Sequence, residues 1–554
     1  MKKMKKILAF VMAMAMVLGM GVTSFASNYT ADKATVLGVE DETPAPTTEN
    51  PNPTNPVKVY GYQIIKYSEE GKYVPVLEEA SITKDGEGNL TPTAEDAAKL
   101  AARLTELAGK MDNKKPVEFV GQDDGSYTSG ALTKAGTWLI VVTGSAKYLY
   151  NPAILSVRQG ENGLVYPVLN LNTDSWGNTA YLKKSAPTIT KEVKSQDAAT
   201  VQYGDVLEFE VKSDIPSYTG KLESITYKVS DKLEGLKLVV NDTDKKAVIT
   251  FEGVNADAAD EVKAAVATLE GKAKAAIVND ATSFEIDFSN NADELQKLPV
   301  NTKMVIKYYA KVTTEAKLTV DETTNTAKLE YSTNNDTTTQ KKEATTTHYT
   351  FGFDTKFSGD ESKTTSEFVK IDKDGNIEEY LTNQTEAKPL ADAWFQVHIN
   401  SKDGKIFAGP GSLVDDTKGA YYKTDSNGRL EITGLDGDVN YYLVEIKAPT
   451  GYSIVEDAIK VKITPTYDKT TGILEGYSVT VGKENETGTV TNYGYSEKKT
   501  TVSGVQNPYG FKNTKLSSLP STGGIGTTIF TIGGCAIMIV AAGLFFASRR
   551  KSSK

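Results

Sequence analysis

The sequence predicts a mainly β protein, built from tandem immunoglobulin-like β-sandwich domains with a few short helices. Most segments are short runs of β-branched and aromatic residues separated by Gly, Asn and Asp, which is typical of antiparallel strands. The run from Val206 to Val211 alternates apolar with charged side chains, as a half-buried strand does. Two helices are expected, one after the N-cap Thr93 and one over residues 257–276.

The 554 residues leave room for about three or four domains of ordinary size. The segment before them, residues 27–56, is rich in Pro, Thr and Asn, so we expect an extended leader there. Polar, turn-rich sequence then separates three segments of sandwich length. The expected domains cover residues 57–184, 185–350 and 360–515.

The N-terminus predicts export. Its basic first residues are followed by an apolar run from Ile7 to Val22 and by a small-x-small pattern that ends at Ala26. This order is typical of a secretory signal peptide over residues 1–26. The alternative is an uncleaved membrane anchor, which the short length of the apolar run disfavours.

The C-terminus combines a short motif, an apolar segment at residues 527–547 and a basic tail at residues 548–554. The apolar segment is long enough to span a bilayer, and the basic tail is expected to stay in the cytoplasm. This order resembles the LPxTG cell-wall sorting signal of Gram-positive bacteria, in which a sortase cuts between Thr and Gly and passes the Thr carbonyl to an amine. The resemblance implies a wall-anchored surface protein that is cut after Thr522. The motif residues are Leu519, Pro520, Ser521, Thr522 and Gly523.

Composition disfavours several classes of function. The net charge of −10 argues against nucleic-acid binding. The only cysteine, Cys535, lies in the apolar segment, so disulfides cannot stabilise the domains. The two histidines are isolated, and the sequence has no metal-ligand cluster or phosphate-binding loop, so we expect no metal or cofactor. Residues 372–376 are similar to a calcium loop, but their glycine comes too early, which favours a hairpin turn.

Several polar side chains fall on strand faces that should be buried. Side chains alternate between the two faces of a strand, so a charged residue two positions from apolar neighbours shares their face. In the second domain this places Lys191, Asp231 and Asn325 in apolar register. The corresponding residues of the third domain are Lys370, Glu445 and Asn513. Because a buried unpaired charge is costly, the repeated pattern argues against chance.

A lysine, an acid and an asparagine that are buried together can form an isopeptide bond. Desolvation lowers the pKa of the lysine and raises that of the acid, so the amine can become a neutral nucleophile. The acid can polarise the carboxamide and carry protons while ammonia leaves, and the fold holds the groups in contact. Register alone leaves a second interpretation open, in which these residues are buried salt bridges or lysines that reach solvent at strand edges.

Residues 440–452, NYYLVEIKAPTGY, closely resemble the E-box of Cna B-type domains in Gram-positive pilins. The resemblance implies that Glu445 catalyses an isopeptide bond between Lys370 and an asparagine just before the sorting signal. Asn513 fits that position, and Asn492 is the alternative.

The second domain resembles the fimbrial isopeptide-forming domain of shaft pilins. The similarity lies in residues 187–191, 227–231 and 325–327. It implies a bond between Lys191 and Asn325 that Asp231 catalyses.

The first domain resembles a pilin N-terminal domain at residues 136–140 and 150–153. Its last residues, 176–184, read WGNTAYLKK and are similar to the motif WxxxVxVYPK of shaft pilins, with one residue fewer and no proline. The resemblance implies that Lys183 attacks the sortase-bound threonine of the next subunit, with Lys184 as the alternative.

Together these features predict a major pilin with a structural rather than an enzymatic role. Its expected partners are a pilus sortase, a housekeeping sortase, other pilin copies, minor pilins and peptidoglycan, with a host surface ligand as a further candidate. The alternative is a wall-anchored adhesin or minor pilin that uses the same domains as a stalk. A secreted hydrolase is the third interpretation, and no multiple-turnover site supports it.

Overall fold

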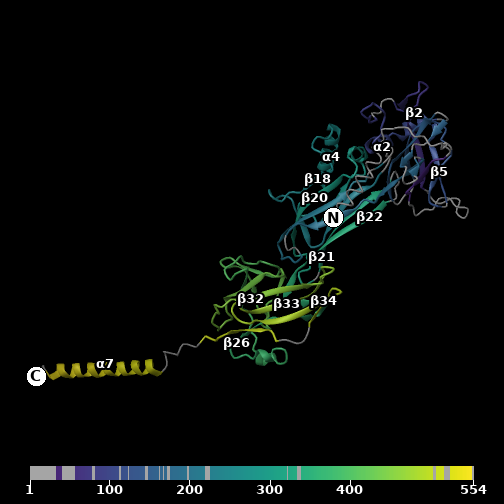
Figure 1. The fold of residues 1–554 in the computed structure, drawn as a ribbon. Helices are drawn as coiled ribbons and strands as arrows, with labels where there is room; N and C mark the ends of the chain where they lie inside the picture. The colour runs from purple at the N-terminus through teal and green to yellow at the C-terminus, as the bar shows by residue number, and fades with distance from the viewer. Residues whose placement is uncertain are drawn as a thin grey trace. The chain divides into compact units, whose positions relative to one another are not determined.

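The computed structural model is mainly β, as the sequence predicts (Figure 1). It describes residues 33–39, 57–77, 82–111, 114–122, 124–130, 132–143, 148–160, 163–165, 168–170, 175–176, 178–195, 199–216, 218, 225–320, 322–333, 339–502, 507–516 and 525–551. The predicted signal peptide, most of the leader and the motif at 519–524 lie outside these residues.

The chain divides into two compact units. The first contains residues 1–200, 204–316 and 322–348, and the second contains residues 201–203, 317–321 and 349–554. Within them, the strand pairings of the described residues fall in three stretches of sequence, which end near residues 185, 349 and 513.

The first stretch forms a nine-stranded sheet with the order β12-β1-β5-β4-β2-β6-β8-β9, and β3 pairs with β2. Two further pairs are β10 with β11 and β7 with β13. The strands are β1 (Thr35–Leu37), β2 (Lys58–Tyr67), β3 (Tyr73–Pro75), β4 (Val117–Gly121), β5 (Tyr127–Ser129), β6 (Gly136–Thr143), β7 (Leu149–Asn151), β8 (Ala153–Gly160), β9 (Gly163–Val165), β10 (Val168–Asn170), β11 (Ser175–Trp176), β12 (Thr179–Tyr181) and β13 (Lys183–Ser185).

Helices α2 (Ala94–Ala101) and α3 (Leu104–Gly109) lie in the same stretch. The predicted N-cap is confirmed: the Thr93 hydroxyl accepts from the Asp96 amide at 3.1 Å, and the Asp96 carboxylate accepts from the Thr93 amide at 2.9 Å.

The second stretch forms a sandwich of two sheets. One sheet has the order β14-β15-β20-β17 with β18 on β20, and the other has the order β19-β16-β21-β22. The strands are β14 (Ile189–Val193), β15 (Val206–Asp214), β16 (Tyr227–Leu233), β17 (Leu236–Val239), β18 (Val248–Glu252), β19 (Ser283–Asp287), β20 (Lys303–Val312), β21 (Glu322–Ser332) and β22 (Thr339–Tyr349). In the sequence, helix α4 (Asp260–Ala276) lies between β18 and β19, and helix α5 (Ala292–Lys297) lies between β19 and β20. Helix α4 confirms the helix expected at 257–276.

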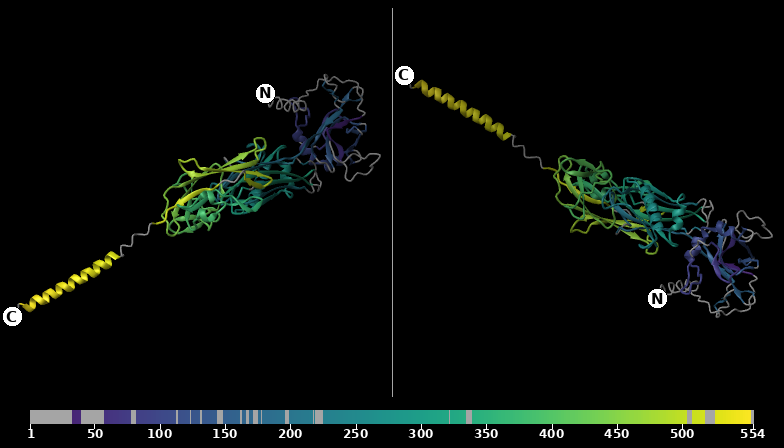
Figure 2. Two further views of the ribbon diagram at one scale, coloured as in Figure 1. Left: turned by 90° about the horizontal axis from the view of Figure 1, so that it is seen from below. Right: turned by 90° about the horizontal axis from the view of Figure 1, so that it is seen from above.

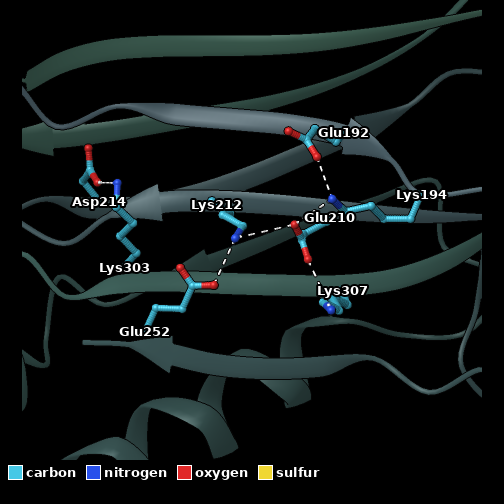
Figure 3. Close-up of polar contacts among 8 residues, drawn as sticks. All are labelled: Glu192, Lys194, Glu210, Lys212, Asp214, Glu252, Lys303 and Lys307. Atoms are coloured by element: carbon cyan, nitrogen blue, oxygen red, sulfur yellow. Dashed lines mark hydrogen bonds and ion pairs between the residues drawn. The ribbon is translucent and has the colours of Figure 1, made fainter. Parts of the chain in front are cut away.

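The outward face of the first of these sheets is charged (Figure 3). The buried Glu210 carboxylate of β15 lies 3.2 Å from the Lys194 ammonium and 3.3 Å from that of Lys307. Lys194 also contacts Glu192 of β14 at 2.6 Å. These ion pairs connect β14 to β15 and β20 on the face opposite Lys191, so they help to fix the register of the strand that carries this lysine.

The third stretch, in the second unit, contains an eight-stranded sheet with the order β28-β29-β27-β31-β32-β33-β34-β35 (Figure 1). Separate pairs are β23 with β30, β24 with β25, and β26 with β36, of which the last is parallel. The elements are β23 (Phe351–Phe353), β24 (Lys356–Phe357), β25 (Asp360–Thr364), β26 (Phe368–Asp372), η2 (Ile377–Glu379), α6 (Gln384–Ala387), β27 (Trp394–Ile399), β28 (Leu413–Asp415), β29 (Gly419–Lys423), β30 (Ile432–Leu435), β31 (Asn440–Lys447), β32 (Ile459–Tyr467), β33 (Leu474–Lys483), β34 (Thr489–Ser496), β35 (Lys499–Val502) and β36 (Tyr509–Asn513).

The expected hairpin at residues 372–376 is wrong. The turn leads from β26 into η2, and β26 pairs with β36 instead of with the next strand. The Asp372 carboxylate accepts from the Tyr452 hydroxyl at 2.7 Å and lies 3.2 Å from the Lys515 ammonium, which lowers its pKa to about 2. This carboxylate therefore joins β26 to the residues that follow β31 and β36.

The last described element is α7 (Ile525–Lys551), which Figure 2 shows as one uninterrupted helix. Its segment Ile529–Arg549 is long and apolar enough to cross a membrane, close to the span predicted at 527–547.

Candidate functional site

Three strands of the first unit bring Lys191, Asp231 and Asn325 together. The Lys191 Nζ lies 2.6 Å from each Asp231 carboxylate oxygen and 2.6 Å from Asn325 Oδ1. Lys191 lies on β14, Asp231 on β16 and Asn325 on β21, so the cluster joins both sheets of the sandwich. The side chains of Lys191 and Asp231 are fully buried, and Asn325 is buried as well.

Burial shifts both ionisable groups of this cluster toward their neutral forms. Desolvation lowers the pKa of Lys191 to about 8, although Asp231 opposes the shift. Desolvation also raises the pKa of Asp231. The rings of Phe209 and Tyr308 lie 5.4 and 5.6 Å from the Lys191 Nζ and exclude water on those sides. A neutral amine beside a carboxamide carbon is the arrangement that nucleophilic attack needs.

One polar member of this cluster, Tyr308 on β20, is not among the residues that the sequence pattern predicts. Its hydroxyl donates to Asp231 Oδ2 at 2.7 Å and accepts from Asn325 Nδ2 at 2.9 Å. In the sequence it follows Ile306 in the buried phase of a strand, where a tyrosine is indistinguishable from an ordinary core residue.

The second unit holds the second cluster, in which Lys370, Glu445 and Asn513 meet. The Lys370 Nζ lies 3.1 Å from Glu445 Oε1 and contacts Asn513 Oδ1. Asn513 Nδ2 donates to both Glu445 oxygens, at 3.0 and 3.2 Å. The amide of Val455 donates to Glu445 Oε2 at 2.8 Å and fixes the carboxylate. Desolvation lowers the pKa of Lys370 to about 8.

Strand pairing explains which asparagine reaches Lys370. β26 and β36 run parallel with Lys370 opposite Phe511, which brings Asn513 to the lysine. The alternative, Asn492, is exposed on β34 opposite Ser478 and is not part of the cluster. The Phe511 ring covers the Lys370 ammonium at 3.8 Å, so this site too is surrounded by aromatic carbon.

The two lysines considered for polymerisation lie on β13 and are exposed. Lys183 pairs with Asn151 of β7 and Lys184 with Tyr150. The Lys184 ammonium lies 4.4 Å from the centre of the Tyr148 ring, a cation–π distance. The sortase motif residues 519–523 lie outside the described residues.

The part of the chain that the structure describes contains no group of three or more His, Cys, Asp or Glu side chains that could hold a metal ion.

Comparison with known proteins adds two family matches and one curated relative. The model of the SpaA prealbumin-like fold domain matches residues 375–475, and the LPXTG cell wall anchor motif matches residues 512–554. The trypsin-resistant surface T6 protein of Streptococcus pyogenes serotype M6 is 26% identical over 466 residues, which is 76% of this chain and 79% of that protein.

Solved structures with a similar chain include two pilins. The T6 backbone pilin of serotype M6 Streptococcus pyogenes is 19% identical, with 89% of this chain and 100% of that chain covered and a TM-score of 0.41. The full-length major pilin SpaD from Corynebacterium diphtheriae is 15% identical, with the same coverages and a TM-score of 0.37.

Proposed function

We propose that this chain, a cell-wall-anchored surface protein with a SpaA-type prealbumin-like domain, is the backbone subunit of a pilus. The observation that carries the proposal is the presence of a buried lysine, acid and asparagine cluster in each compact unit of an LPXTG-anchored chain. The protein's own chemistry occurs once per bond, so its role is structural.

In each cluster the lysine amine attacks the asparagine carboxamide, and ammonia leaves. Asp231 catalyses formation of the bond between Lys191 and Asn325. Glu445 catalyses formation of the bond between Lys370 and Asn513. The close contacts supply the effective molarity that an external enzyme would otherwise provide. The product is an uncharged amide, so the energetic cost of burying a charged pair disappears when the bond forms.

The positions of these bonds suit a fibre under tension. The bonded residues are 134 positions apart in the first unit and 143 positions apart in the second. Once such a bond forms, a pulling force passes through a short covalent path and bypasses the strands between the bonded residues. The domains at 57–184, 185–350 and 360–515 are part of this proposal, and the sheets that end near residues 185, 349 and 513 support it.

Polymerisation uses the same acyl chemistry between chains. A pilus sortase cuts after Thr522 and passes the threonine carbonyl to Lys183 of a neighbouring copy. A housekeeping sortase passes the last subunit to peptidoglycan. The exposure of Lys183 on β13 and the LPXTG anchor match support this step. Lys184 is the alternative nucleophile, and its ammonium lies 4.4 Å from the centre of the Tyr148 ring.

An immunoblot of wall extracts from the native strain and from a Lys183→Ala strain tests the function. We expect a ladder of high-mass species in the native strain and a single anchored species in the variant. A matched control is Lys237→Ala, a lysine paired with Glu315 in the same unit, which should keep the ladder. A single species in the native strain would favour the wall-anchored adhesin or minor pilin, and a persistent ladder in the variant would reject Lys183.

A further inference from the structure

We propose that the Tyr308 hydroxyl is a catalytic proton relay between Asp231 and the leaving nitrogen of Asn325. This inference rests on the proposed bond between Lys191 and Asn325 and assigns a further catalytic residue to its formation.

The position of the hydroxyl carries the inference. Tyr308 Oη lies 2.7 Å from Asp231 Oδ2 and 2.9 Å from Asn325 Nδ2, so it stands between the acid and the atom that must leave. Both Asp231 oxygens also lie 2.6 Å from the Lys191 Nζ. The carboxylate therefore faces the nucleophile, and the hydroxyl faces the leaving group.

The second cluster shows the simpler arrangement. There, Asn513 Nδ2 donates directly to both Glu445 oxygens, at 3.0 and 3.2 Å, so the acid itself reaches the leaving nitrogen. In the first cluster the corresponding nitrogen of Asn325 donates to Tyr308. The shorter side chain of Asp231 and the interposed hydroxyl together take the place of Glu445.

The proposed step balances without a cofactor. The neutral Lys191 amine adds to Cγ of Asn325 and forms a tetrahedral intermediate with a negative oxygen and a positive Nζ. Protonated Asp231 passes its proton to Tyr308 Oη while the hydroxyl proton moves to Nδ2, and Asp231 then takes a proton from Nζ. The intermediate collapses as Nδ2 leaves with three hydrogens. The products are one secondary amide and one ammonia, and Asp231 and Tyr308 return to their starting states.

A tyrosine hydroxyl is suited to this role because it donates one hydrogen bond and accepts others. The amide nitrogen of Asn325 donates in the ground state, and it becomes an acceptor once the carbon is tetrahedral, so the hydroxyl hydrogen need only rotate. Burial and the neighbouring Asp231 raise the pKa of Tyr308 well above its usual range, which keeps the proton on the oxygen.

The test is the Tyr308→Phe variant of the full chain, whose intact mass is measured at intervals during cell-free synthesis. The ring packs against Phe209 at 5.3 Å and Phe284 at 5.4 Å, so phenylalanine keeps this packing and removes the oxygen alone. We expect the Lys191–Asn325 bond to form at least about tenfold more slowly than in the wild type, since positioned acid–base groups commonly contribute more than this. The matched control is Tyr227→Phe, whose fully buried hydroxyl contacts Ser213 at 3.2 Å, and it should form the bond at the wild-type rate.

Peptide mapping of the same samples separates the two bonds. The Lys370–Asn513 bond lies in the other unit and should form at the wild-type rate in Tyr308→Phe, and a circular dichroism spectrum equal to that of the wild type shows that the variant chain folds. Equal rates for the Lys191–Asn325 bond in wild type and Tyr308→Phe would overturn the relay and leave the bond itself intact. A wild-type chain that never loses ammonia from Asn325 would instead overturn the bond, and the relay with it.

Discussion

At the scale of single residues, burial determines what each polar group can do. The side chains of Lys370 and Glu445 are fully buried, where an ion pair loses its hydration. A lysine held in this state keeps a low pKa, and an adjacent carboxamide offers it a permanent neutral product. The same surroundings that make the charged cluster costly therefore favour the amide.

Removing the acid should stop the reaction and leave its partners in place. For Glu445→Ala we expect intact mass to show one ammonia retained relative to the wild type, because Lys370 and Asn513 remain unjoined. The control is Glu475→Ala, an exposed glutamate of β33 in the same unit, which should match the wild type. Loss of both ammonias from Glu445→Ala would show that the acid is not required.

Two buried acids outside the lysine clusters, Asp354 and Glu367, should make the stability of the fold depend on pH. The Asp354 carboxylate accepts from the amides of Glu367, at 2.8 Å, and Leu430, at 3.0 Å. Glu367 accepts from the Asp354 amide at 2.7 Å and from the Tyr493 hydroxyl at 2.6 Å. Burial of both side chains raises the pKa of Asp354 and of Glu367.

The direction in which pH changes the free energy of unfolding depends on whether the folded or the unfolded chain binds more protons. A raised pKa means that the folded chain holds protons that the unfolded chain releases above the ordinary values of 3.8 and 4.5. The contribution to the free energy of unfolding is therefore complete below those values and is lost as pH rises through the folded pKa values. Calorimetry should show the melting temperature of the wild type falling relative to Glu367→Gln as pH rises above the ordinary glutamate value of 4.5.

The control for this measurement is Glu361→Gln, at an exposed position of β25 that is close to Glu367 in the sequence. Its melting temperature should stay at a constant offset from the wild type across the range. A constant offset for Glu367→Gln as well would contradict the assignment of bound protons to the buried pair.

At the scale of elements, a close backbone contact holds Lys370 in register. Gly428 lies in a turn with φ of +73°, and its carbonyl accepts from the Lys370 amide at 2.8 Å. A Cβ at this position would lie 2.4 Å from the Lys370 carbonyl oxygen. The turn can approach β26 this closely only because Gly428 has no side chain.

Gly428→Ala should therefore shift β26. We expect a loss of about 3 kcal/mol in the free energy of unfolding, from the left-handed backbone and the clash together, and slower formation of the Lys370–Asn513 bond. The control is Gly472→Ala, which has φ of +70° but open space where a Cβ would lie, and it should cost about 1 kcal/mol with no change in bond formation. Urea unfolding and intact mass measure the two effects, and equal effects of the two substitutions would contradict the role of the contact.

The strands also show which parts of the site can be predicted from the sequence. Strand alternation sufficed to place Lys191, Asp231 and Asn325 on buried faces, because the period of two is local information. The choice between Asn513 and Asn492 depended on a parallel pairing of β26 with β36, which joins residues far apart in the chain. Local patterns do not specify such a partner.

Tyr308 was missed for a different reason. Its aromatic ring is as apolar as its strand neighbours require, so nothing in the sequence distinguishes a core tyrosine from one whose hydroxyl meets an acid. Only the packing of β20 against β16 and β21 brings the hydroxyl to Asp231 and Asn325.

At the scale of the whole molecule, the proposed internal bonds and the wall anchor form one covalent path. Each unit holds a lysine and an asparagine in contact that lie more than a hundred positions apart in the sequence, and the LPXTG anchor match covers residues 512–554. A head-to-tail link uses two different surfaces of the subunit, so repeated addition extends a filament instead of closing a dimer.

The most direct measurement is tandem mass spectrometry of peptides from purified high-mass wall material. We expect a branched peptide in which the Thr522 carbonyl is joined to the ε-amine of Lys183 of another copy. Thr522 found only on peptidoglycan amines, with every Lys183 unmodified, would contradict it.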